Sequence, residues 1–366
     1  MKISVLVPVY KEPKFLTDIA KKIWASKHPD REVLAVVDGA MTAPIRAALD
    51  ELGDQVKTVH PGDHLGKAGA LNRAALGLET DALLFLDNDI LLPEDPEFLS
   101  VLASELEDHD IVDLPKEVLV QSPFSSMIGY EYQGLAMASL AFSKIARRSP
   151  GLIGAAFAVR KDLFAQLEGF RKVVHEDGDF AARAFRLHAR YSFRMRLKVK
   201  TSMPDSFRDW VTQRKRWTLI NVLWFKENFL HLLASVFKQP ALLPTLLFII
   251  FPTILSFAVF AGLNFLQLAW LDPFVFMVGS PFQVAAGVIL WFAHHQLVVQ
   301  GLLSTTLGFA VAAAMYLGFS WLGKFRFNLI SFAVFYFLYM PLLVVINLVM
   351  FATQFRQTRV KLDWKT

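Results

Sequence analysis

Short apolar runs alternate with amphipathic segments in the first part of the chain. The runs that predict β-strands are Ile3–Val9, Glu32–Val37, Val56–Val59 and Ala82–Leu86, and those with helical spacing are Leu16–Trp24, Pro44–Leu52 and Gly69–Leu78. Buried strands that alternate with helices predict an α/β fold, with a parallel sheet and crossover helices. Ligands bind such sheets beyond the carboxyl ends of the strands. Tyr10, Asp38 and Asp87 follow three of these runs, so we expect the functional site there.

The pattern from about residue 110 to 200 is less regular. It predicts a helix over Ser125–Ser143, a glycine-flanked strand in GLIGAAFAVR, and a helix over Phe180–Leu187 after HEDGD. Strict alternation from Ser192 onward predicts a further strand, with the basic residues of RYSFRMRLKVKT on a face washed by solvent.

Large apolar residues recur at helical spacing from Ser206 to Phe237, with basic residues between them. This pattern is typical of amphipathic helices that lie in a membrane interface. Trp210, Trp224 and Phe225 are the expected interface anchors. We expect Arg214 and Lys215 to face lipid headgroups, so that Arg214→Ala would change little.

The remainder of the chain is long and uncharged. Ala241–Leu268 and Asn328–Phe351 are each long enough for one membrane helix, and Pro273–Leu322 for two. Four spans would return the basic tail to the cytoplasm, as the positive-inside rule favours. Lys324 and Arg326 would then lie outside, whereas three spans would place them inside and export the tail.

Charge is divided unevenly along the chain. Between Gln239 and Phe355 only Asp272, Lys324 and Arg326 are charged, whereas residues 1–238 hold 32 basic and 31 acidic side chains. Because this front part is nearly neutral, we expect no nucleic-acid partner. The chain has no cysteine, which excludes disulfides and thiolate metal sites. Its first residues, MKISVLVPVYKEP, predict a strand rather than a signal peptide, so the front part is expected in the cytoplasm.

Two acidic motifs are candidates for chemistry. In LLFLDNDILLP, Asp87 and Asp89 follow a buried strand and could meet one divalent cation, although a capped turn would use the same residues. In VVHEDGDF, Glu176, Asp177 and Asp179 are crowded, which raises the pKa of carboxyl groups and suits a general base. The alternative for this second motif is a helix N-cap.

Two basic motifs accompany them. HLGKAGALN places Lys67 at the start of a predicted helix, where an anion could bind, although an ordinary glycine turn remains open. QRKRW offers guanidinium groups for a diphosphate and Trp217 as a flat face for a sugar ring. Taken alone, this pentapeptide would be an interfacial anchor.

The order of these motifs carries more information than any one of them. PVYKEP, a strand that ends in Asp38, GKAGALN, DND, HED and QRKRW follow one another and precede the apolar segments. This order resembles the family-2 glycosyltransferases, in particular the membrane-integral branch with cellulose, chitin and hyaluronan synthases, over residues 1 to about 220. The resemblance implies a GT-A fold, with a mixed, mainly parallel sheet and flanking helices. It also implies interface helices and an all-α transmembrane region after the sheet.

The resemblance implies a nucleotide-sugar donor, expected to be a UDP-sugar, and Mg²⁺ or Mn²⁺ as cofactor. The residues implied to bind the nucleotide sugar are Tyr10, Glu12, Asp38, Lys67, Asp87, Gln213 and Arg216. Asp89, together with Asp87, is implied to bind the metal, and Asp177 to act as the general base. Trp217 and Glu176 are implied to bind the acceptor. Two positions depart from the family pattern. Val37-Asp38 stands where paired aspartates are usual, and His175 stands where threonine is common.

We therefore expect an inverting glycosyltransferase of the plasma membrane. The expected parts are a cytosolic catalytic domain (1–203), interface helices (204–238), a transmembrane region (239–355) and a basic cytosolic tail (356–366). The acceptor would be a growing polysaccharide or oligosaccharide; the alternative is a single transfer to a membrane lipid. Membrane lipids and a second copy of the chain are the other expected partners. A transporter or scaffold whose front domain merely binds nucleotide is the competing class. A dolichyl-phosphate sugar transferase with an appended membrane region is a third possibility, although QRKRW is not expected there.

Overall fold

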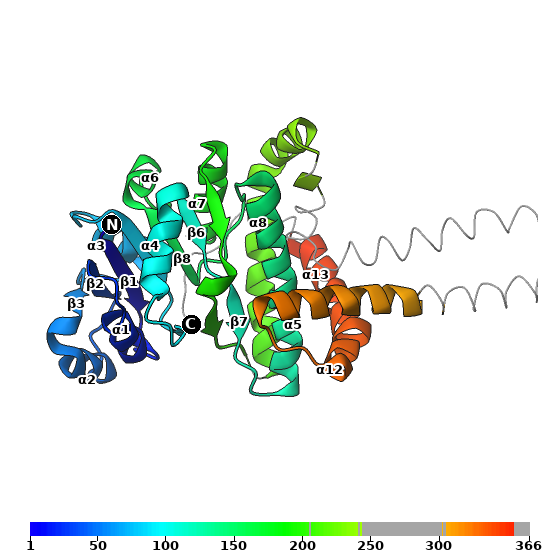
Figure 1. Ribbon diagram of the computed structural model, residues 1–366, viewed down its shortest axis with the longest axis horizontal. Helices are drawn as coiled ribbons and strands as arrows, with labels where there is room; N and C mark the ends of the chain where they lie inside the picture. The colour runs from blue at the N-terminus through cyan, green and yellow to red at the C-terminus, as the bar shows by residue number, and fades with distance from the viewer. Residues whose placement is uncertain (205, 241, 244–301, 303–304, 355–366) are drawn as a thin grey trace, which may run out of the picture. The chain divides into compact units, whose positions relative to one another are not determined.

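A mixed seven-stranded sheet runs through the N-terminal part of the computed structural model (Figure 1). The structure describes residues 1–204, 206–240, 242–243, 302 and 305–354. The chain divides into unit 1, which comprises Met1–Leu246 and Asn347–Thr366, and unit 2, which comprises Leu247–Ile346.

The strand order of the large sheet is β3-β2-β1-β4-β8-β6-β9. All neighbouring strands are parallel except that β8 runs antiparallel to both β4 and β6, which confirms the mixed, mainly parallel sheet. The strands are β1 Ile3–Val9, β2 Arg31–Val37, β3 Lys57–Val59, β4 Ala82–Leu86, β6 Ile111–Asp113, β8 Ala156–Arg160 and β9 Tyr191–Phe193. Because β8 is reversed, its first residue, Ala156, pairs with Leu86 at the end of β4.

Aliphatic side chains cover one face of this sheet. Helices α1 (Leu16–Trp24), α2 (Ala43–Leu52) and α4 (Phe98–Asp108) pack there in one continuous core. On α1 the buried residues Leu16, Ile19 and Ile23 recur every three or four positions, which places them on the same side of the helix. Each such fully buried side chain stabilises the fold by roughly 1.5–3 kcal/mol.

Phenylalanine rings cover the opposite face. Phe85 of β4 and Phe157 of β8 contact Phe164 of α6 (Lys161–Gln166), Phe170, and Phe180 of α7 (Glu176–Arg186). Neighbouring ring centroids in this cluster lie 5.0–6.3 Å apart, within the range of favourable aromatic pairs. The cluster therefore fixes α7 against the sheet.

The predicted continuous strand after Ser192 is wrong. The chain instead forms β9, a 3-10 turn over Met195–Leu197, and β10 (Val199–Thr201), which joins β5 (Ile90–Leu91) and β7 (Lys116–Val118) in a second, three-stranded sheet. The basic side chains expected in solvent form ion pairs across this change of sheet: Arg194 with Glu105, Arg196 with Asp95, and Lys198 with Glu117.

Two long helices stand beside the sheet, α5 (Pro123–Ala141) and α8 (Phe207–Lys238) (Figure 1). The segment expected to form several interface helices is one continuous helix. Trp210 is fully buried beside Phe124, and Trp224 is buried with its indole N–H donating to the carbonyl of Gly178 at 3.1 Å. The prediction that these two tryptophans are exposed membrane anchors is therefore wrong.

The prediction for Arg214 is also wrong. This side chain is buried, forms an ion pair with Glu131 of α5, and lies over the rings of Trp210 and Trp217, 5.5 and 4.5 Å from their centroids. Arg214 therefore joins α8 to α5 and does not face lipid headgroups. Lys215, the next residue, is exposed as expected.

Within the described residues, two helices are long and apolar enough to cross a membrane, by length and composition only. They are Thr305–Gly323 and Leu329–Thr353, the second of which comprises α12 (Leu329–Val334), a π-helical turn (Phe335–Tyr339) and α13 (Met340–Gln354). They overlap the end of the predicted Pro273–Leu322 segment and the predicted span Asn328–Phe351. The predicted span Ala241–Leu268 and the first part of Pro273–Leu322 lie outside the described residues.

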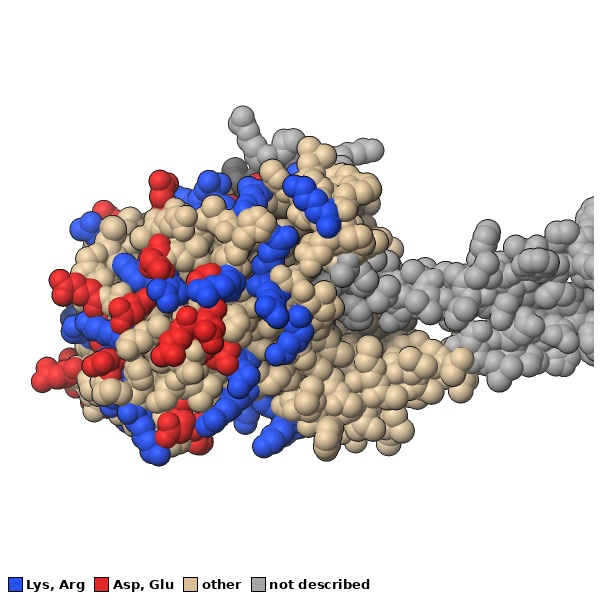
Figure 2. All heavy atoms as spheres, turned by 45° about the horizontal axis from the view of Figure 1, so that its top comes forward, with Lys and Arg blue, Asp and Glu red and all other residues tan. Residues whose placement is uncertain are grey.

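The distribution of charge on the described surface follows the sequence. Figure 2 shows basic and acidic side chains interspersed over the sheet-containing part of the molecule, with no large region of one sign on the face in view. This mixed surface agrees with the near balance of 32 basic and 31 acidic residues in positions 1–238.

Candidate active site

The carboxyl ends of three parallel strands meet at one edge of the sheet. β1 lies between β2 and β4, so Tyr10, Asp38 and Asp87, which follow these strands, share that edge as predicted. The ends of β1 and β2 are joined, since Asp38 donates its N–H to the carbonyl of Val9 at 3.0 Å.

Asp38 lies at the centre of a first polar cluster. Its carboxylate is buried and accepts the backbone N–H of Leu65 at 2.7 Å and the Nδ1 of His64 at 2.9 Å. Because a carboxylate only accepts hydrogen bonds, Nδ1 is the donor in this contact. The Tyr10 ring lies 5.2 Å from the imidazole of His64 and is itself exposed.

His64 was not among the predicted site residues, although it opens the stretch HLGKAGALN. A histidine before a glycine-rich turn has no distinctive spacing, and only the fold shows that it meets Asp38. Glu12, by contrast, was predicted to bind nucleotide. Its backbone N–H donates to Tyr10 at 2.7 Å and its carbonyl accepts from Asn88 at 2.8 Å, while its side chain is exposed.

Lys67 lies at the centre of a second, charged cluster. It belongs to the first turn of α3 (Gly66–Ala75), a helix that begins earlier than predicted. Its Nζ is 2.6 Å from Asp87 and 3.8 Å from Glu176, and its side chain is 36% exposed. Burial disfavours the ammonium charge, but the two carboxylates outweigh it and hold the pKa of Lys67 above its ordinary value. Lys67 therefore stays charged.

Asp87 and Asp89 present two carboxylates near one another. Burial, followed by the charge of Asp87, raises the pKa of Asp89, and Lys14 lies 3.9 Å away. A hard cation would relieve this repulsion, so the pair fits Mg²⁺ or Mn²⁺. No cluster of three or more potential side-chain ligands occurs in the described part of the chain. Further ligands would therefore have to come from water or from a bound phosphate.

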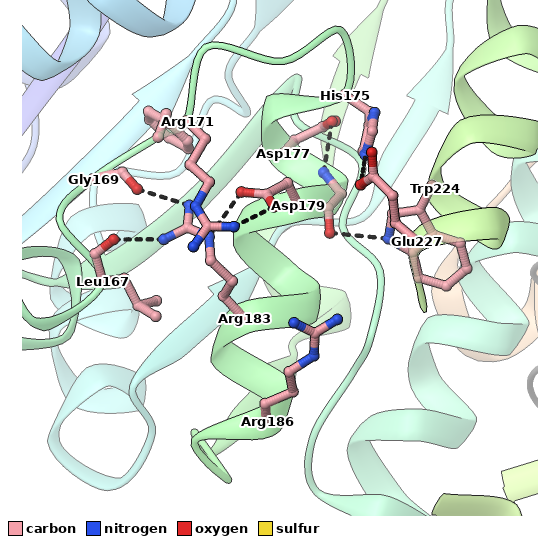
Figure 3. Close-up of polar contacts among 12 residues, drawn as sticks. Leu167, Gly169, Arg171, His175, Asp177, Asp179, Arg183, Arg186, Trp224 and Glu227 are labelled. Atoms are coloured by element: carbon pink, nitrogen blue, oxygen red, sulfur yellow. Dashed lines mark hydrogen bonds and ion pairs between the residues drawn. The ribbon is translucent and has the colours of Figure 1, made fainter. Parts of the chain in front are cut away.

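The N-terminus of α7 holds the second acidic motif. The helix begins at Glu176 rather than at Phe180 as predicted, so Glu176 and Asp177 lie in its first turn, where the helix dipole favours acidic residues. Asp177 accepts the backbone N–H of Gly154 at 2.7 Å and that of Gly178 at 2.8 Å (the latter in Figure 3). The two donors fix the orientation of this carboxylate.

Glu176 and Asp179 have different surroundings. Burial is the main cause that raises the pKa of Glu176 to about 7; the charge of Lys67 opposes it and that of Asp177 adds to it. Asp179 forms an ion pair with Arg183 at 2.7 Å, and Arg183 also donates to the carbonyl of Gly169 (Figure 3). Asp179 therefore stabilises the fold around α7.

α8 contacts the start of α7 and also packs against α5. His175, just before α7, lies 3.2 Å from Glu227 of α8 (Figure 3). Trp217 is half-buried, with its ring 6.3 Å from that of Tyr132 on α5. Trp217 therefore packs against α5.

Gln213 and Arg216 lie on the same helix. The Oε1 of Gln213 is buried without a hydrogen-bond partner among the described residues, while Arg216 is exposed. Gln213 and Trp217, four positions apart, share one side of α8.

Residues 4–167 match the model of the family described as Glycosyl transferase family 2. No curated protein sequence matches the chain. Among solved structures, a mannosyltransferase from Pyrobaculum calidifontis in complex with GDP-Man and Mn²⁺ aligns with a TM-score of 0.51 at 19% identity, over 92% of this chain and 87% of its own. This likeness shows a GT-A-like fold.

TarS from S. aureus also aligns. The match has a TM-score of 0.44 at 16% identity, over 62% of this chain and 39% of TarS. A TarS fragment, residues 1–349 in complex with UDP-GlcNAc, aligns with a TM-score of 0.42 at 17% identity, over 61% of this chain and 67% of the fragment.

Proposed function

Starting from the match of residues 4–167 to the Glycosyl transferase family 2 model, we propose that this protein is a membrane-embedded, inverting glycosyltransferase. It moves a sugar from a nucleotide-sugar donor to a hydroxyl group of an acceptor. The observation that carries this proposal is the cluster of Lys67 with Asp87 and Glu176, at 2.6 and 3.8 Å, beside the fixed carboxylate of Asp177.

The donor binds along the carboxyl edge of the sheet. Tyr10 and Asp38 receive the nucleobase and ribose, and Lys67, Gln213 and Arg216 receive the diphosphate, whose negative charge their cationic and amide groups match. The GDP-Man in the mannosyltransferase structure supports a nucleotide sugar as donor. We expect a UDP- or GDP-sugar.

A divalent cation completes the diphosphate site. Asp89 and Asp87 would hold it, and when bound it would neutralise the charge that develops on the leaving diphosphate. The Mn²⁺ in the mannosyltransferase structure supports this role.

Asp177 acts as the general base. It takes the proton from an acceptor hydroxyl while the acceptor oxygen forms a bond to the anomeric carbon. The bond from that carbon to the diphosphate oxygen breaks, and its electron pair leaves with the diphosphate, which Lys67 and Arg216 stabilise. One displacement from the opposite side inverts the anomeric configuration.

The acceptor lies between Asp177 and Trp217, where a sugar ring can stack on the indole. Glu176 lines the same space. Exposed apolar residues on the later turns of α8, such as Leu230 and Phe237, would place this end of the site at a membrane surface. A growing polysaccharide or oligosaccharide is the acceptor we propose; a membrane lipid is the alternative.

The test uses the full chain in detergent micelles with UDP- and GDP-sugars and either Mg²⁺ or Mn²⁺. Release of the nucleoside diphosphate identifies the donor, and sizing of a labelled product separates a polymer from a lipid with one added sugar. Asp177→Asn should slow transfer by roughly 10²–10⁴-fold, the usual contribution of a general base. Asp50→Asn, at an exposed position on α2, is the matched control. Consumption of no nucleotide sugar, or full activity of Asp177→Asn, would refute the proposal.

A further inference from the structure

We propose that His64, held by Asp38, accepts a hydrogen bond from the nucleobase of the donor. This inference rests on the proposed function and adds a residue to which the motifs assign no role. His64 lies in the segment between β3 and α3 (Figure 1), and its ring contacts Tyr10 and Asp38, the residues that follow β1 and β2.

The carboxylate of Asp38 is engaged within the fold. Asp38 is only 6% exposed, and each of its oxygens has a partner. Oδ1 accepts the backbone N–H of Leu65 at 2.7 Å, and Oδ2 lies 2.9 Å from Nδ1 of His64. The side chain of His64, by contrast, is 50% exposed. A nucleoside at this edge of the sheet would therefore meet the imidazole before it meets the carboxylate.

The segment that carries His64 is fixed to the turn after β2. Besides the contacts with Asp38, the Nε2 of His60 lies 2.7 Å from the carbonyl oxygen of Gly39. A Cβ atom at Gly39 would lie 3.4 Å from the ring of Tyr10 and 3.9 Å from Nδ1 of His64, so both rings lie close against this turn. Groups that are held in this way lose little freedom when they bind a ligand.

The imidazole of His64 offers one acceptor that the fold does not use. Because Nδ1 is the donor to Asp38, Nε2 is an acceptor in the neutral ring. Among the described residues, Nε2 of His64 has no hydrogen-bond partner. It therefore suits an N–H group of a ligand.

The neighbouring ring of Tyr10 favours a nucleobase as that ligand. This ring is 41% exposed and lies 5.2 Å from that of His64, at an angle of 31°. An exposed aromatic ring binds the flat face of a base by stacking, and the edge of the base would then reach the imidazole. Uracil and guanine carry a ring N–H on this edge, whereas cytosine and adenine carry an unprotonated nitrogen at the corresponding position. The two rings therefore favour a UDP- or GDP-sugar.

The experiment separates Nε2 of His64 from the contact of Nδ1 with Asp38. Calorimetry on the full chain in detergent, with saturating Mn²⁺ at about pH 8, where imidazole is ordinarily neutral, first determines whether UDP or GDP binds the wild type. His64→Asn keeps a donor near the position of Nδ1 and removes Nε2. It should weaken that nucleotide by about three- to tenfold, the size of one neutral hydrogen bond.

Two controls accompany this variant. The affinity of His64→Asn for inorganic pyrophosphate should equal that of the wild type, because the phosphates lie elsewhere in the proposed site. His109→Asn makes the same change just before β6, at the opposite edge of the sheet, and should bind UDP or GDP like the wild type.

A methylated base identifies the donor atom. 3-Methyl-UDP, or 1-methyl-GDP if GDP is the ligand, lacks the ring N–H. It should bind the wild type more weakly than the parent nucleotide. The loss caused by His64→Asn should disappear with this analogue, because both changes remove the same hydrogen bond.

The outcomes separate the inference from the proposed function. If His64→Asn binds the parent nucleotide like the wild type, or weakens pyrophosphate equally, the inference is overturned. It is overturned as well if the wild type binds the methylated and the parent nucleotide equally, or if His64→Asn weakens both by the same factor, as a contact with the ribose would. If the wild type binds neither UDP nor GDP, the proposed function falls and the inference falls with it.

Discussion

Gly154 governs the position of the proposed base. A Cβ atom at this residue would lie 2.5 Å from Oδ2 of Asp177, which is closer than any real contact. Asp177 can therefore approach the Gly154 N–H only because no side chain is present. The arrangement links a backbone position on the loop before β8 to the chemistry at the start of α7.

We predict that Gly154→Ala slows transfer by about 100-fold, because a displacement of about 1 Å in a reacting group has effects of this size. Binding of the donor nucleotide should be kept. Gly129→Ala on α5, where a Cβ would make an ordinary contact of 3.9 Å with Val118, is the control and should keep its activity. Steady-state rates and nucleotide titrations measure both properties. Unchanged rates in Gly154→Ala would contradict the role given to this contact.

Glu176 should make stability depend on pH. Its pKa is raised to about 7 in the folded protein, against about 4.3 in an unfolded chain. Between these values the folded state binds a proton that the unfolded state has lost, so stability falls as the pH rises from about 4 to 7. Glu176→Gln removes this contribution. Thermal unfolding should therefore show that the free energy of unfolding of the variant, relative to that of the wild type, increases by about 1–3 kcal/mol between pH 5 and pH 8. A constant difference across this range would contradict the raised pKa.

At the scale of helices and strands, the ion pair between Arg214 and Glu131 joins α8 to α5. Removal of one member would leave a buried charge without its partner. We predict that Arg214→Ala lowers the free energy of unfolding by about 3–5 kcal/mol. Lys215→Ala, one position along at an exposed site, should change it by less than about 0.5 kcal/mol. Denaturant titration in micelles distinguishes the two.

A double variant tests the reason for that loss. Arg214→Met combined with Glu131→Leu removes both charges and keeps apolar volume, so it should recover most of the stability lost in Arg214→Met alone. If the double variant is no more stable than the single one, the pair is not what holds the two helices together.

Several elements could be predicted from the sequence because local pattern decides them. Ile3–Val9, Leu16–Trp24 and Ala82–Leu86 have the predicted bounds, since each is an apolar or amphipathic run that ends at polar or turn residues. The start of α7 was placed too late because HEDGD is polar and resembles a loop. Its acidic residues instead favour the N-terminus of a helix.

Contacts between distant residues could not be predicted in this way. The partner of Arg214 lies 83 positions earlier, and nothing in QRKRW shows that one of its guanidinium groups is buried. His64 was missed for the same reason, since it gains its meaning from Asp38 on another element. Lys67, Asp87 and Glu176 could be predicted as site residues because the order of their motifs along the chain is distinctive. The structure brings these three side chains together.

For the whole molecule, the uneven distribution of charge predicts an integral membrane protein. The full chain should remain in the membrane pellet after extraction with alkaline carbonate, since four apolar segments of membrane length cannot be solvated by water. Recovery in the supernatant would contradict this prediction.

The distribution of charge also predicts on which side of the membrane the C-terminal tail lies. With four spans, an epitope after Thr366 should be digested by protease added to inside-out vesicles and protected in right-side-out vesicles. The reverse pattern would favour three spans, with Lys324 and Arg326 on the cytoplasmic side.

The reversed direction of β8 has a consequence for how such enzymes can diversify. Because β8 is reversed, the loop that reaches the site comes before this strand in the chain. Gly154, on this loop, therefore follows every residue proposed to bind the nucleobase or the metal, the last of which is Asp89. A chimera joined after Leu92 could thus exchange the acceptor half of one enzyme for that of another while keeping its donor preference. The exchange must preserve the contacts across that junction, which include Lys67 with Glu176 and the paired hydrogen bonds of Asn72 with Phe170.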